Sequence, residues 1–378
     1  MKGAGFAASW PVRELWRRRG RFAGVTVTLT VLCTLAVILV SLGSGLWAGA
    51  TGALRSSPAD LVVFSRDSLS LFPRSRIALA AIPQIGRVRG VAAVGALGTL
   101  TTTVALRGAT ASVAVIGAIP GRPGAPAAVV SGRLPRRGED SAAVDVALRA
   151  EGVRLGSRIR QAAGGPPLRV VGFVADQRFE LLPTVWTTLT AWQALSAAAR
   201  PETRTAAPAA QVLTIRLTPS ADAATVARAV DAQLAATTLT RSQAILAIPG
   251  AAAMRSTINE LIAAVLLVAA GVTALFAALY TAERRSELAR LRALGSSAAR
   301  LAAGLLAQAE APVIIGTAAA YGITAALIAA APPQFPVALP LTRALGLAGL
   351  IMAAGAAGTG LSLLRVLRID PAITVEDL

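Results

Sequence analysis

The sequence predicts a membrane protein with four transmembrane α-helices and a mixed α+β extracytoplasmic domain between the first and second helices. Hydrophobic residues make up 54% of the 378 residues and charged residues only 15%, against about 25% charged residues in soluble globular proteins. The apolar residues gather in four long runs, and about 200 residues of mixed composition separate the first run from the second. The arginines cluster at those ends of the runs that would share one side of the membrane.

Each of the four runs is long enough to cross a bilayer, which takes about 20 apolar residues. The predicted transmembrane helices are residues 22–50, 257–282 (which includes a stalk), 301–330 and 344–364. The first run follows a basic segment, as the apolar part of a cleaved signal peptide does, but it is about twice as long as such a part. We therefore predict a retained helix, in which Cys33 is a buried small side chain.

The positions of the arginines predict which side of the membrane each loop occupies. Basic residues are concentrated in segments 1–21, 283–300 and 365–378, whereas residues 331–341 carry no charge. Because cytoplasmic loops are enriched in Lys and Arg, both termini and the loop at 283–300 are predicted to be cytoplasmic. The domain at 51–256 and the short loop at 331–343 are then extracytoplasmic.

The N-terminal segment combines Trp10, Leu15 and Trp16 with basic side chains. This composition predicts an amphipathic helix that lies in the headgroup layer and contacts membrane lipid. The alternative is a plain basic flank that only sets the orientation of the first helix.

The domain at 51–256 alternates between short strand and helix patterns, which favours βαβ-like units over a sandwich. Apolar runs rich in Val and Thr predict strands at 61–64, 91–106, 112–119, 168–174 and 211–217. Helical spacing predicts helices at 77–88, 142–150, 190–199 and 221–234. From about Ala251 the pattern is helical into the second transmembrane helix, which predicts one continuous stalk.

The composition excludes several classes of catalytic site. The chain has no histidine and one cysteine, so it has neither a histidine-based triad nor a disulfide within the chain. The Walker A and Gly-x-Ser-x-Gly patterns are absent, so no ATP site of the P-loop type is expected. Glu139 and Asp140 lie in an Arg-Arg-Gly-Glu-Asp-Ser run that is typical of a solvated turn. No catalytic residue, metal or cofactor is therefore expected in this chain.

The outer domain is predicted to be strongly basic. Between Arg55 and Arg255 the sequence holds 23 arginines and 11 acidic residues, a difference of 12 positive charges. This charge could attract an anionic wall polymer or lipid headgroups, or it could reflect a general bias toward arginine. Nucleic acid is not expected as a partner, because the domain faces away from the cytoplasm.

A short charged helix is predicted between the second and third transmembrane helices, and it is expected to end at Gly295. Leu288, Leu291 and Leu294 recur at every third position and form one apolar stripe. The charged residues that flank this stripe are Glu283, Arg284, Arg285, Glu287, Arg290 and Arg292. On the cytoplasmic side the stripe either docks into a groove on a partner or rests on the membrane surface.

Glu310, beside Gln308 and Pro312, is the only acidic residue within the apolar runs 22–50, 261–282, 301–330 and 344–364; Glu260 lies in the stalk before the second run. Burying an ionisable group in a bilayer is costly, and such residues are functional by default. Two interpretations remain open for Glu310. It is either a hydrogen-bond partner between helices, which we favour, or an ion or proton site.

The string from Glu283 to Gly295, Glu-Arg-Arg-Ser-Glu-Leu-Ala-Arg-Leu-Arg-Ala-Leu-Gly, resembles the cytoplasmic loop of FtsX-like ABC transporter permeases, a group that includes the MacB-type and DevC-type proteins. Three outer segments resemble the MacB-like periplasmic domain of that family: Ser131-Gly-Arg-Leu-Pro, Leu155-Gly-Ser-Arg-Ile and Leu168-Arg-Val-Val-Gly-Phe-Val. The C-terminal Arg368-Ile-Asp-Pro-Ala resembles the closing motif of the family. One helix, a large outer domain and three further helices is also the layout of the family.

The resemblance implies a non-catalytic permease subunit in a bacterial cell (inner) membrane. Such permeases work as dimers with two copies of a separate cytoplasmic ATPase, which uses ATP and Mg, while the permease chain binds no cofactor. The resemblance also implies that the segment from Glu283 to Gly295 docks on that ATPase. The Gly-rich outer end of the first helix (Gly43, Gly45, Gly49 and Gly52) could bring two copies of the chain into close contact.

Two functions fit this resemblance. The first is export of a peptide, lipid or drug, which the permease would hand to an extracytoplasmic adaptor. The second is mechanotransmission, in which the outer domain regulates an extracytoplasmic partner such as a cell-wall hydrolase. Both couple ATP hydrolysis in the partner ATPase to motion of the outer domain, and the identity of the outer partner would distinguish them.

Overall fold

The computed structural model describes residues 19–106, 109–200, 208–283, 298–331, 337, 342, 344–353 and 356–357. It divides the chain into an outer unit, Gly45–Arg255, and a helical unit formed by Met1–Ser44 and Ser256–Leu378. Two long helices contribute residues to both units: α2 (Arg19–Arg55) and α7 (Ala251–Glu283). The helix α7 begins at the residue where the sequence predicts the stalk.

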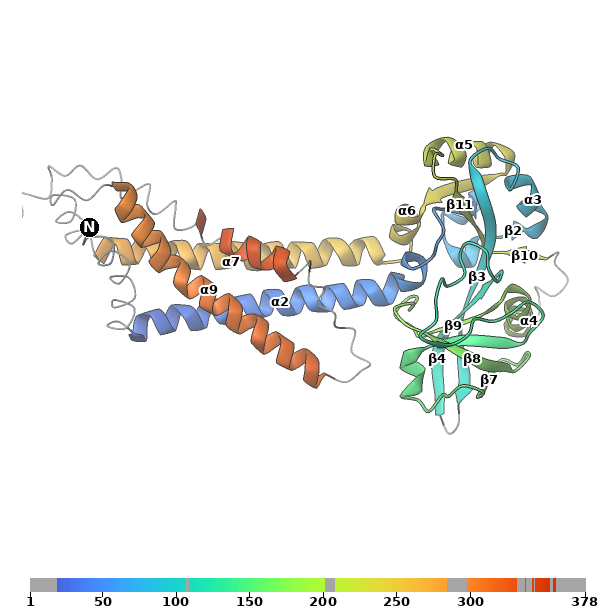
Figure 1. Cartoon of the computed structure of the whole chain (residues 1–378), viewed down its shortest axis with the longest axis horizontal. Helices are drawn as coiled ribbons and strands as arrows, with labels where there is room; N and C mark the ends of the chain where they lie inside the picture. Colours follow the sequence, from blue (N-terminus) through green and yellow to red (C-terminus); the bar gives the residue numbers. More distant parts are fainter. Residues whose placement is uncertain are drawn as a thin grey trace, which may run out of the picture. The chain divides into compact units, whose positions relative to one another are not determined.

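One part of the outer unit is a β-α-β-β-α-β arrangement of four strands and two helices, of which β3, β11, α3 and α5 are labelled in Figure 1. The four strands lie in the order β12-β1-β11-β3, and neighbours are antiparallel. Since β1 and β3 both flank β11, they run parallel to each other and are connected through α3; β11 and β12 are likewise connected through α5. These are split βαβ units, so the expected βαβ-like units are present with an antiparallel strand between their parallel strands. The elements are β1 (Leu61–Ser65), α3 (Ile82–Ile85), β3 (Val91–Leu106), β11 (Val212–Leu217), α5 (Ala223–Gln233) and β12 (Ala236–Thr240).

The other part of the outer unit is inserted between β3 and β11 and extends the same sheet. Strand β3 is long enough to pair with β11 through its first half and with β4 through its second half. The sheet continues in the order β4-β9-β6-β8-β5, with β4·β9 and β6·β8 parallel, and β7 pairs with both β3 and β8. The inserted elements are β4 (Ala109–Ala118), β5 (Ser131–Gly132), β6 (Ser141–Asp145), β7 (Arg158–Gln161), β8 (Leu168–Val174), β9 (Thr184–Thr188) and α4 (Leu189–Ala199).

Smaller elements complete the outer unit. Strands β2 and β10 form a separate two-stranded sheet. They and the remaining helices are β2 (Ile77–Ala78), β10 (Ala209–Ala210), α6 (Arg241–Leu246), η1 (Arg66–Ser68), η2 (Phe72–Arg74), η3 (Leu79–Ala81) and η4 (Val146–Arg149).

Both faces of the sheet are covered, and strand β1 shows how. Leu61 and Val63 face a core that includes residues of α3, α4 and α5. Val62 and Phe64 face a second core that includes residues at the end of α2, in α6 and at the start of α7. All four side chains are buried, because a strand covered on both faces is apolar at every position rather than at every second one.

A pair of glycines fixes α4 on the sheet. Gly98 of β3 and Gly117 of β4 are directly opposite each other. A Cβ atom on either would lie within 2.4 Å of the Trp192 side chain. The two missing side chains therefore leave the slot that the indole fills, and Trp192 is buried there.

One local prediction for the outer domain is wrong. Residues 142–150 were expected to form a helix, but 141–145 are strand β6 and 146–149 a 3₁₀ turn. Helix-forming alanines lie in this strand because β6 pairs with β8 on one side and β9 on the other, and tertiary pairing overrides weak propensity. The expected helix at 77–88 is also shorter, since only 79–85 are helical. Strands at 61–64 and 168–174 are confirmed.

Among the described residues, three helices are long and apolar enough to span a membrane. The spanning segments are Phe22–Arg55, Ala251–Phe276 and Glu310–Ala330, the last within α9 (Ala298–Ala330). A shorter apolar helix covers Ala344–Ala353. The fourth transmembrane helix, at 344–364, therefore stays a prediction.

Close packing and internal hydrogen bonds suit these helices to a lipid environment. A Cβ on Gly43 would lie 2.6 Å from Ile258 of α7, and a Cβ on Gly316 would lie 3.2 Å from the Thr30 nitrogen. The Thr30 and Ser41 hydroxyls each donate to the carbonyl four residues earlier, at 2.7 Å, which satisfies them where no water is available. Large apolar side chains such as Val31, Leu267 and Ile315 are more than half exposed, as expected of lipid-facing positions.

Candidate functional site at the joint of the two long helices

The end of α2 and the start of α7, which belong to the outer unit, pack into one small region of that unit, which we call the joint. It consists of residues 45–55 of α2, the loop at 176–182 and residues 251–255 of α7. Three main-chain hydrogen bonds connect α2 to the loop. Ala53 N–H donates to the Arg178 carbonyl at 3.0 Å, while the Glu180 and Leu181 N–H groups donate to the carbonyls of Ala50 and Gly49 at 3.1 and 3.0 Å. These bonds hold the helix through its own backbone rather than through side chains alone.

Two glycines of α2 allow the loop to approach this closely. A Cβ on Gly52 would lie 2.6 Å from the Asp176 carbonyl oxygen and 3.1 Å from the Arg178 nitrogen, both main-chain atoms. A Cβ on Gly49 would lie 3.1 Å from Leu181 Cδ2, the tip of a flexible side chain. Gly52 is therefore required for the contact, whereas Gly49 is only favourable. Both glycines were candidates for a contact between two copies of the chain, but the structure places them against their own outer domain.

The loop at 176–182 has an unusual backbone conformation, and the buried side chain of Phe179 holds it in place. Asp176, Glu180 and Leu181 have φ angles of 56°, 50° and 67°, a left-handed region that residues other than glycine seldom adopt. Phe179 is buried, and its ring packs edge-to-face against Phe72 at 5.6 Å. The aromatic contact fixes the loop to η2, whose Phe72 in turn packs against Phe64 of β1, while the loop backbone holds α2.

The start of α7 reaches the same hydrophobic cluster as the end of α2. Ala251 of α7 and Ala53 and Leu54 of α2 are all buried in it. The Arg255 guanidinium lies over the Trp47 ring, 5.6 Å from its centroid, within the range of a cation–π contact. Both long helices thus have one end in the same packed cluster, which also includes buried residues of the sheet such as Val62 and Phe64.

Two carboxyl groups at or beside the joint have raised pKa values. Burial raises the pKa of Asp145, although the Ala147 N–H bonded to it and the charge of Arg178 oppose the rise. Partial desolvation also raises the pKa of Glu180. Both carboxyl groups therefore take up a proton at a higher pH than a solvated carboxyl would.

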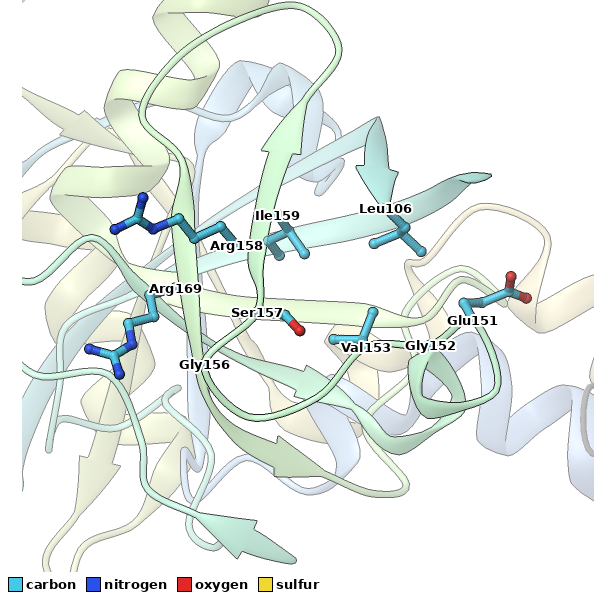
Figure 2. Close-up of a pocket in the computed structure, with 9 residues that line it drawn as sticks. All are labelled: Leu106, Glu151, Gly152, Val153, Gly156, Ser157, Arg158, Ile159 and Arg169. Carbon is cyan, nitrogen blue, oxygen red and sulfur yellow. The ribbon is translucent and has the colours of Figure 1, made fainter. Parts of the chain in front are cut away.

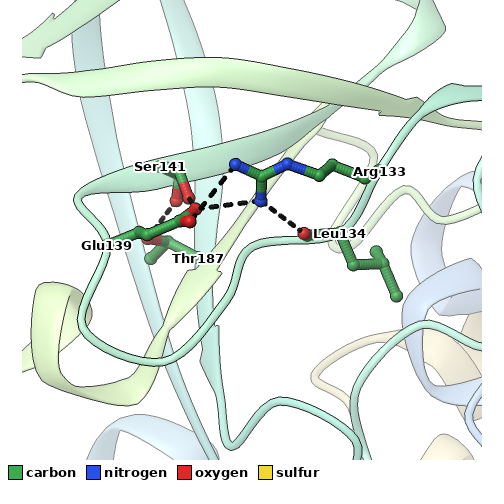
Figure 3. Close-up of polar contacts among 5 residues, drawn as sticks. All are labelled: Arg133, Leu134, Glu139, Ser141 and Thr187. Carbon is green, nitrogen blue, oxygen red and sulfur yellow. Dashed lines mark hydrogen bonds and ion pairs between the residues drawn. The ribbon is translucent and has the colours of Figure 1, made fainter.

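The segments on which the sequence resemblance rests meet in space. Gly132 of β5 is paired with Gly172 of β8, and a Cβ on Gly172 would lie 2.2 Å from the Arg133 carbonyl oxygen. Two segments about 40 residues apart therefore pair at glycines, because a side chain on Gly172 would collide with the main chain of the partner strand. Glu139, expected in a solvated turn, is half-buried and accepts two hydrogen bonds from Arg133, at 2.9 and 3.3 Å (Figure 3).

The same network closes the turn that follows. Ser141 donates to Glu139 Oε2 at 3.1 Å, and Thr187 of β9 donates to the Ser141 carbonyl at 2.8 Å (Figure 3). The Arg133 guanidinium lowers the pKa of Glu139, so the pair stays charged at neutral pH. Glu139 therefore braces the turn between β5 and β6 through Arg133 and Ser141.

Comparison with known families identifies the two parts of the chain. The family model described as a MacB-like periplasmic core domain matches residues 24–233, which are 210 of the 378 residues. The model described as FtsX-like permease C-terminal matches residues 261–371. The chain belongs to the FtsX-like, MacB-type family of ABC transporter permeases.

Solved structures similar to this permease are domains of related transporters. The extracellular domain of the noncanonic ABC-type transporter YknZ from Gram-positive bacteria is 13% identical, with a TM-score of 0.35 over 47% of this chain and 98% of that one. The periplasmic region of MacB from Actinobacillus actinomycetemcomitans is 10% identical, with a TM-score of 0.35 over 50% of this chain and 92% of that one. At these TM-scores the likeness adds nothing to the family assignment. No curated protein sequence matches the permease.

Membership of this family fixes the general role of the permease. It is the transmembrane component of an ABC transporter in a bacterial membrane, and the ATPase is a separate cytoplasmic subunit. The family also implies dimerisation. Among the residues that the structure describes, no group of three or more His, Cys, Asp or Glu side chains could hold a metal ion.

The site residues predicted from the sequence lie mostly outside the described part of the permease. Glu283 is the last residue of α7 and is exposed. The other nine, from Arg284 to Gly295, lie outside the described residues. Gln308 lies in α9, and Glu310 lies two residues further along it, half-buried. Sequence reasoning missed the joint altogether; the Gly49 and Gly52 spacing was its only signal.

Glu310 has a buried carboxylate oxygen, Oε1, for which the described residues supply no hydrogen-bond partner. We expect Glu310→Gln to retain assembly and most coupled activity, because the amide oxygen can occupy the same position and the amide nitrogen adds a donor. The measurement is ATP turnover and subunit recovery of the purified complex, relative to the unsubstituted permease. Normal assembly with loss of activity would instead support a role that depends on the charge.

Proposed function

We propose that this permease transmits ATP-driven motion of a separate cytoplasmic ATPase to its outer domain through α2 and α7. The ATPase binds and hydrolyses Mg-ATP, and the segment from Glu283 to Gly295 docks on it. The motion serves export of a peptide, lipid or drug. The alternative use is regulation of an extracytoplasmic partner such as a cell-wall hydrolase.

The observation that carries this proposal is the joint. The helices α2 and α7 contain 37 and 33 residues, which correspond to about 55 and 50 Å at 1.5 Å per residue. The hydrocarbon core of a bilayer is about 30 Å thick, so each helix is long enough to cross it and to continue into the outer domain. A rigid rod transmits displacement only if its end is fixed, and both ends are embedded in the same cluster.

The orientation that this function needs is the one that the arginine distribution predicts. Both termini and the loop at 283–300 face the cytoplasm, and the outer unit is extracytoplasmic. A second copy of the permease would complete the assembly, so that two ATPase subunits act on two outer domains. Closure of the ATPase pair would then change the separation of the outer domains.

The experiment measures that separation in the complete complex. Cys33→Ala removes the native thiol, and Ala232→Cys places one spin label on an exposed position of α5. We expect the label-to-label distance between the two protomers to change by several Å between the nucleotide-free and the vanadate-trapped complex. A complex with an ATPase variant that cannot bind ATP is the control. An identical distance in both nucleotide states would contradict the proposal.

The same complex separates the two uses of the motion. If an extracytoplasmic adaptor protein is recovered with the permease, export is favoured. If a cell-wall hydrolase is recovered and its activity depends on ATP turnover, regulation is favoured.

A further inference from the structure

Three arginines lie together on one exposed face of the β7–β8 strand pair. Along β7 exposure alternates, so Arg158 and Arg160 are exposed while Ile159 is buried. Arg169 is the exposed residue of β8 directly opposite Arg158. We call Arg158, Arg160 and Arg169 the arginine cluster. Arg158 and Arg169 belong to two of the segments that resemble the family's outer domain, and the joint does not use either of them.

The register brings two of these side chains as close as a sheet allows. Arg169 N–H donates away from β7, to the Asp140 carbonyl at 3.0 Å, whereas the neighbouring Val170 donates to Ser157 at 2.8 Å. Arg158 and Arg169 are thus a non-hydrogen-bonded pair, the closer of the two kinds, with Cβ atoms about 4.5–5.5 Å apart. Arg160 follows two residues along the strand, about 7 Å from Arg158.

The described acidic residues around the cluster are not paired with it, although the Asp140 carbonyl accepts from the Arg169 main-chain N–H and Glu151 lines an adjoining cavity. None of the three guanidinium groups of the cluster forms a hydrogen bond or an ion pair with the described residues. The nearby Glu139 is occupied by Arg133, and the buried Asp145 accepts from Ala147 N–H at 2.8 Å. Like charges directly opposite each other destabilise a strand pair. The fold therefore retains a repulsive pair that a bound anion would relieve.

A cavity of about 590 Å³ adjoins the cluster, and Arg158 and Arg169 are among the residues that line it. Figure 2 shows both arginines leaving the cavity on the same side, with Glu151 on the opposite side. Gly152 and Gly156 have φ angles of +80° and +86°, and a Cβ on either would meet nothing within 4 Å. Among the described residues, no atom fills the space where these two side chains would be, so the main chain there is open to a ligand.

We propose that the arginine cluster binds a phosphoryl group, held between Arg158 and Arg169 with Arg160 as a further contact. Two opposed guanidinium groups carry two positive charges and present paired N–H donors. A phosphate dianion matches these two charges and has enough oxygen atoms to accept from both guanidinium groups. One carboxylate would neutralise only one of the two charges. This ligand site is independent of whether α2 and α7 transmit motion.

The test uses the full-length permease, purified without its ATPase so that no nucleotide site competes for the probe. Thermal unfolding and calorimetric titration are followed with inorganic pyrophosphate in neutral detergent at constant ionic strength. A second arm replaces the probe with mixed micelles that contain phosphatidic acid, so that a free phosphate and a lipid headgroup are distinguished. The double variant Arg158→Gln/Arg169→Gln is compared with Arg87→Gln/Arg89→Gln, which removes the same charge from two exposed arginines elsewhere on the outer unit.

We expect the cluster variant to lose at least tenfold in affinity for one of the two probes, and the control variant to lose less than twofold. Because the substitution removes a repulsion, the cluster variant without ligand should unfold at the same temperature as the unsubstituted permease or higher. Equal losses in the two variants would show only general attraction to a basic surface and would overturn the proposal. Absence of binding by the unsubstituted permease in both arms would overturn it as well.

Discussion

Leu291→Asp is expected to abolish stable association of the permease with its ATPase. Leu291 is in the middle of the apolar stripe formed with Leu288 and Leu294, and a carboxylate at that position would be desolvated on docking. An unpaired buried charge costs several kcal/mol, and each 1.4 kcal/mol is a factor of about ten in affinity. The measurement is recovery of the ATPase with tagged permease from solubilised membranes, and we expect a loss of at least a hundredfold.

Ser286→Asp is the matched control for this prediction. It adds the same carboxylate to the same predicted helix, but five positions from Leu291, which is about 140° around a helix. We expect near-normal recovery of the ATPase with this variant. Membrane insertion and the unfolding temperature of the outer domain should be unchanged in both variants. Full recovery of a coupled ATPase with Leu291→Asp would show that the stripe only rests on the membrane surface.

Gly52→Ala is expected to uncouple the outer domain from the ATPase without separating the subunits. The added methyl would lie 2.6 Å from the Asp176 carbonyl oxygen, and this main-chain atom cannot move without breaking the hydrogen bond from Ala53 to Arg178. Overpacking of this kind costs about 1–3 kcal/mol. The unfolding temperature of the outer domain should fall by about 2–10 °C, and the ATP-dependent change in distance between the outer domains should decrease by more than half.

Gly49→Ala is the control, because it makes the same chemical change one turn earlier on α2. Its methyl would meet only the tip of Leu181, at 3.1 Å, and that side chain can rotate away. We expect little change in unfolding temperature and a normal ATP-dependent distance change. If Gly52→Ala behaves like Gly49→Ala in both measurements, the joint does not transmit motion, and the proposed lever must act elsewhere.

The sequence predicted the membrane character of the chain well because hydrophobicity is a local property. A run such as Phe22 to Ala50 is apolar whatever its neighbours are. The strand at 61–64 could also be predicted, since four successive apolar residues between polar segments suit a strand covered on both faces. The loop motif from Glu283 to Gly295 and the closing motif near Arg368 indicated the family, which the family models then confirmed.

The tertiary structure alone decided which segments meet and what the glycines are for. Gly52 contacts Arg178 and Gly132 pairs with Gly172, across 126 and 40 residues of sequence, and no local periodicity encodes such a pairing. The alanines of 142–145 favour a helix in isolation, yet they form a strand because β8 and β9 satisfy their backbone groups on both sides. The opposition of Arg158 and Arg169 has the same origin. A sequence sets the preference of each segment, but only the completed sheet determines which side chains are brought face to face.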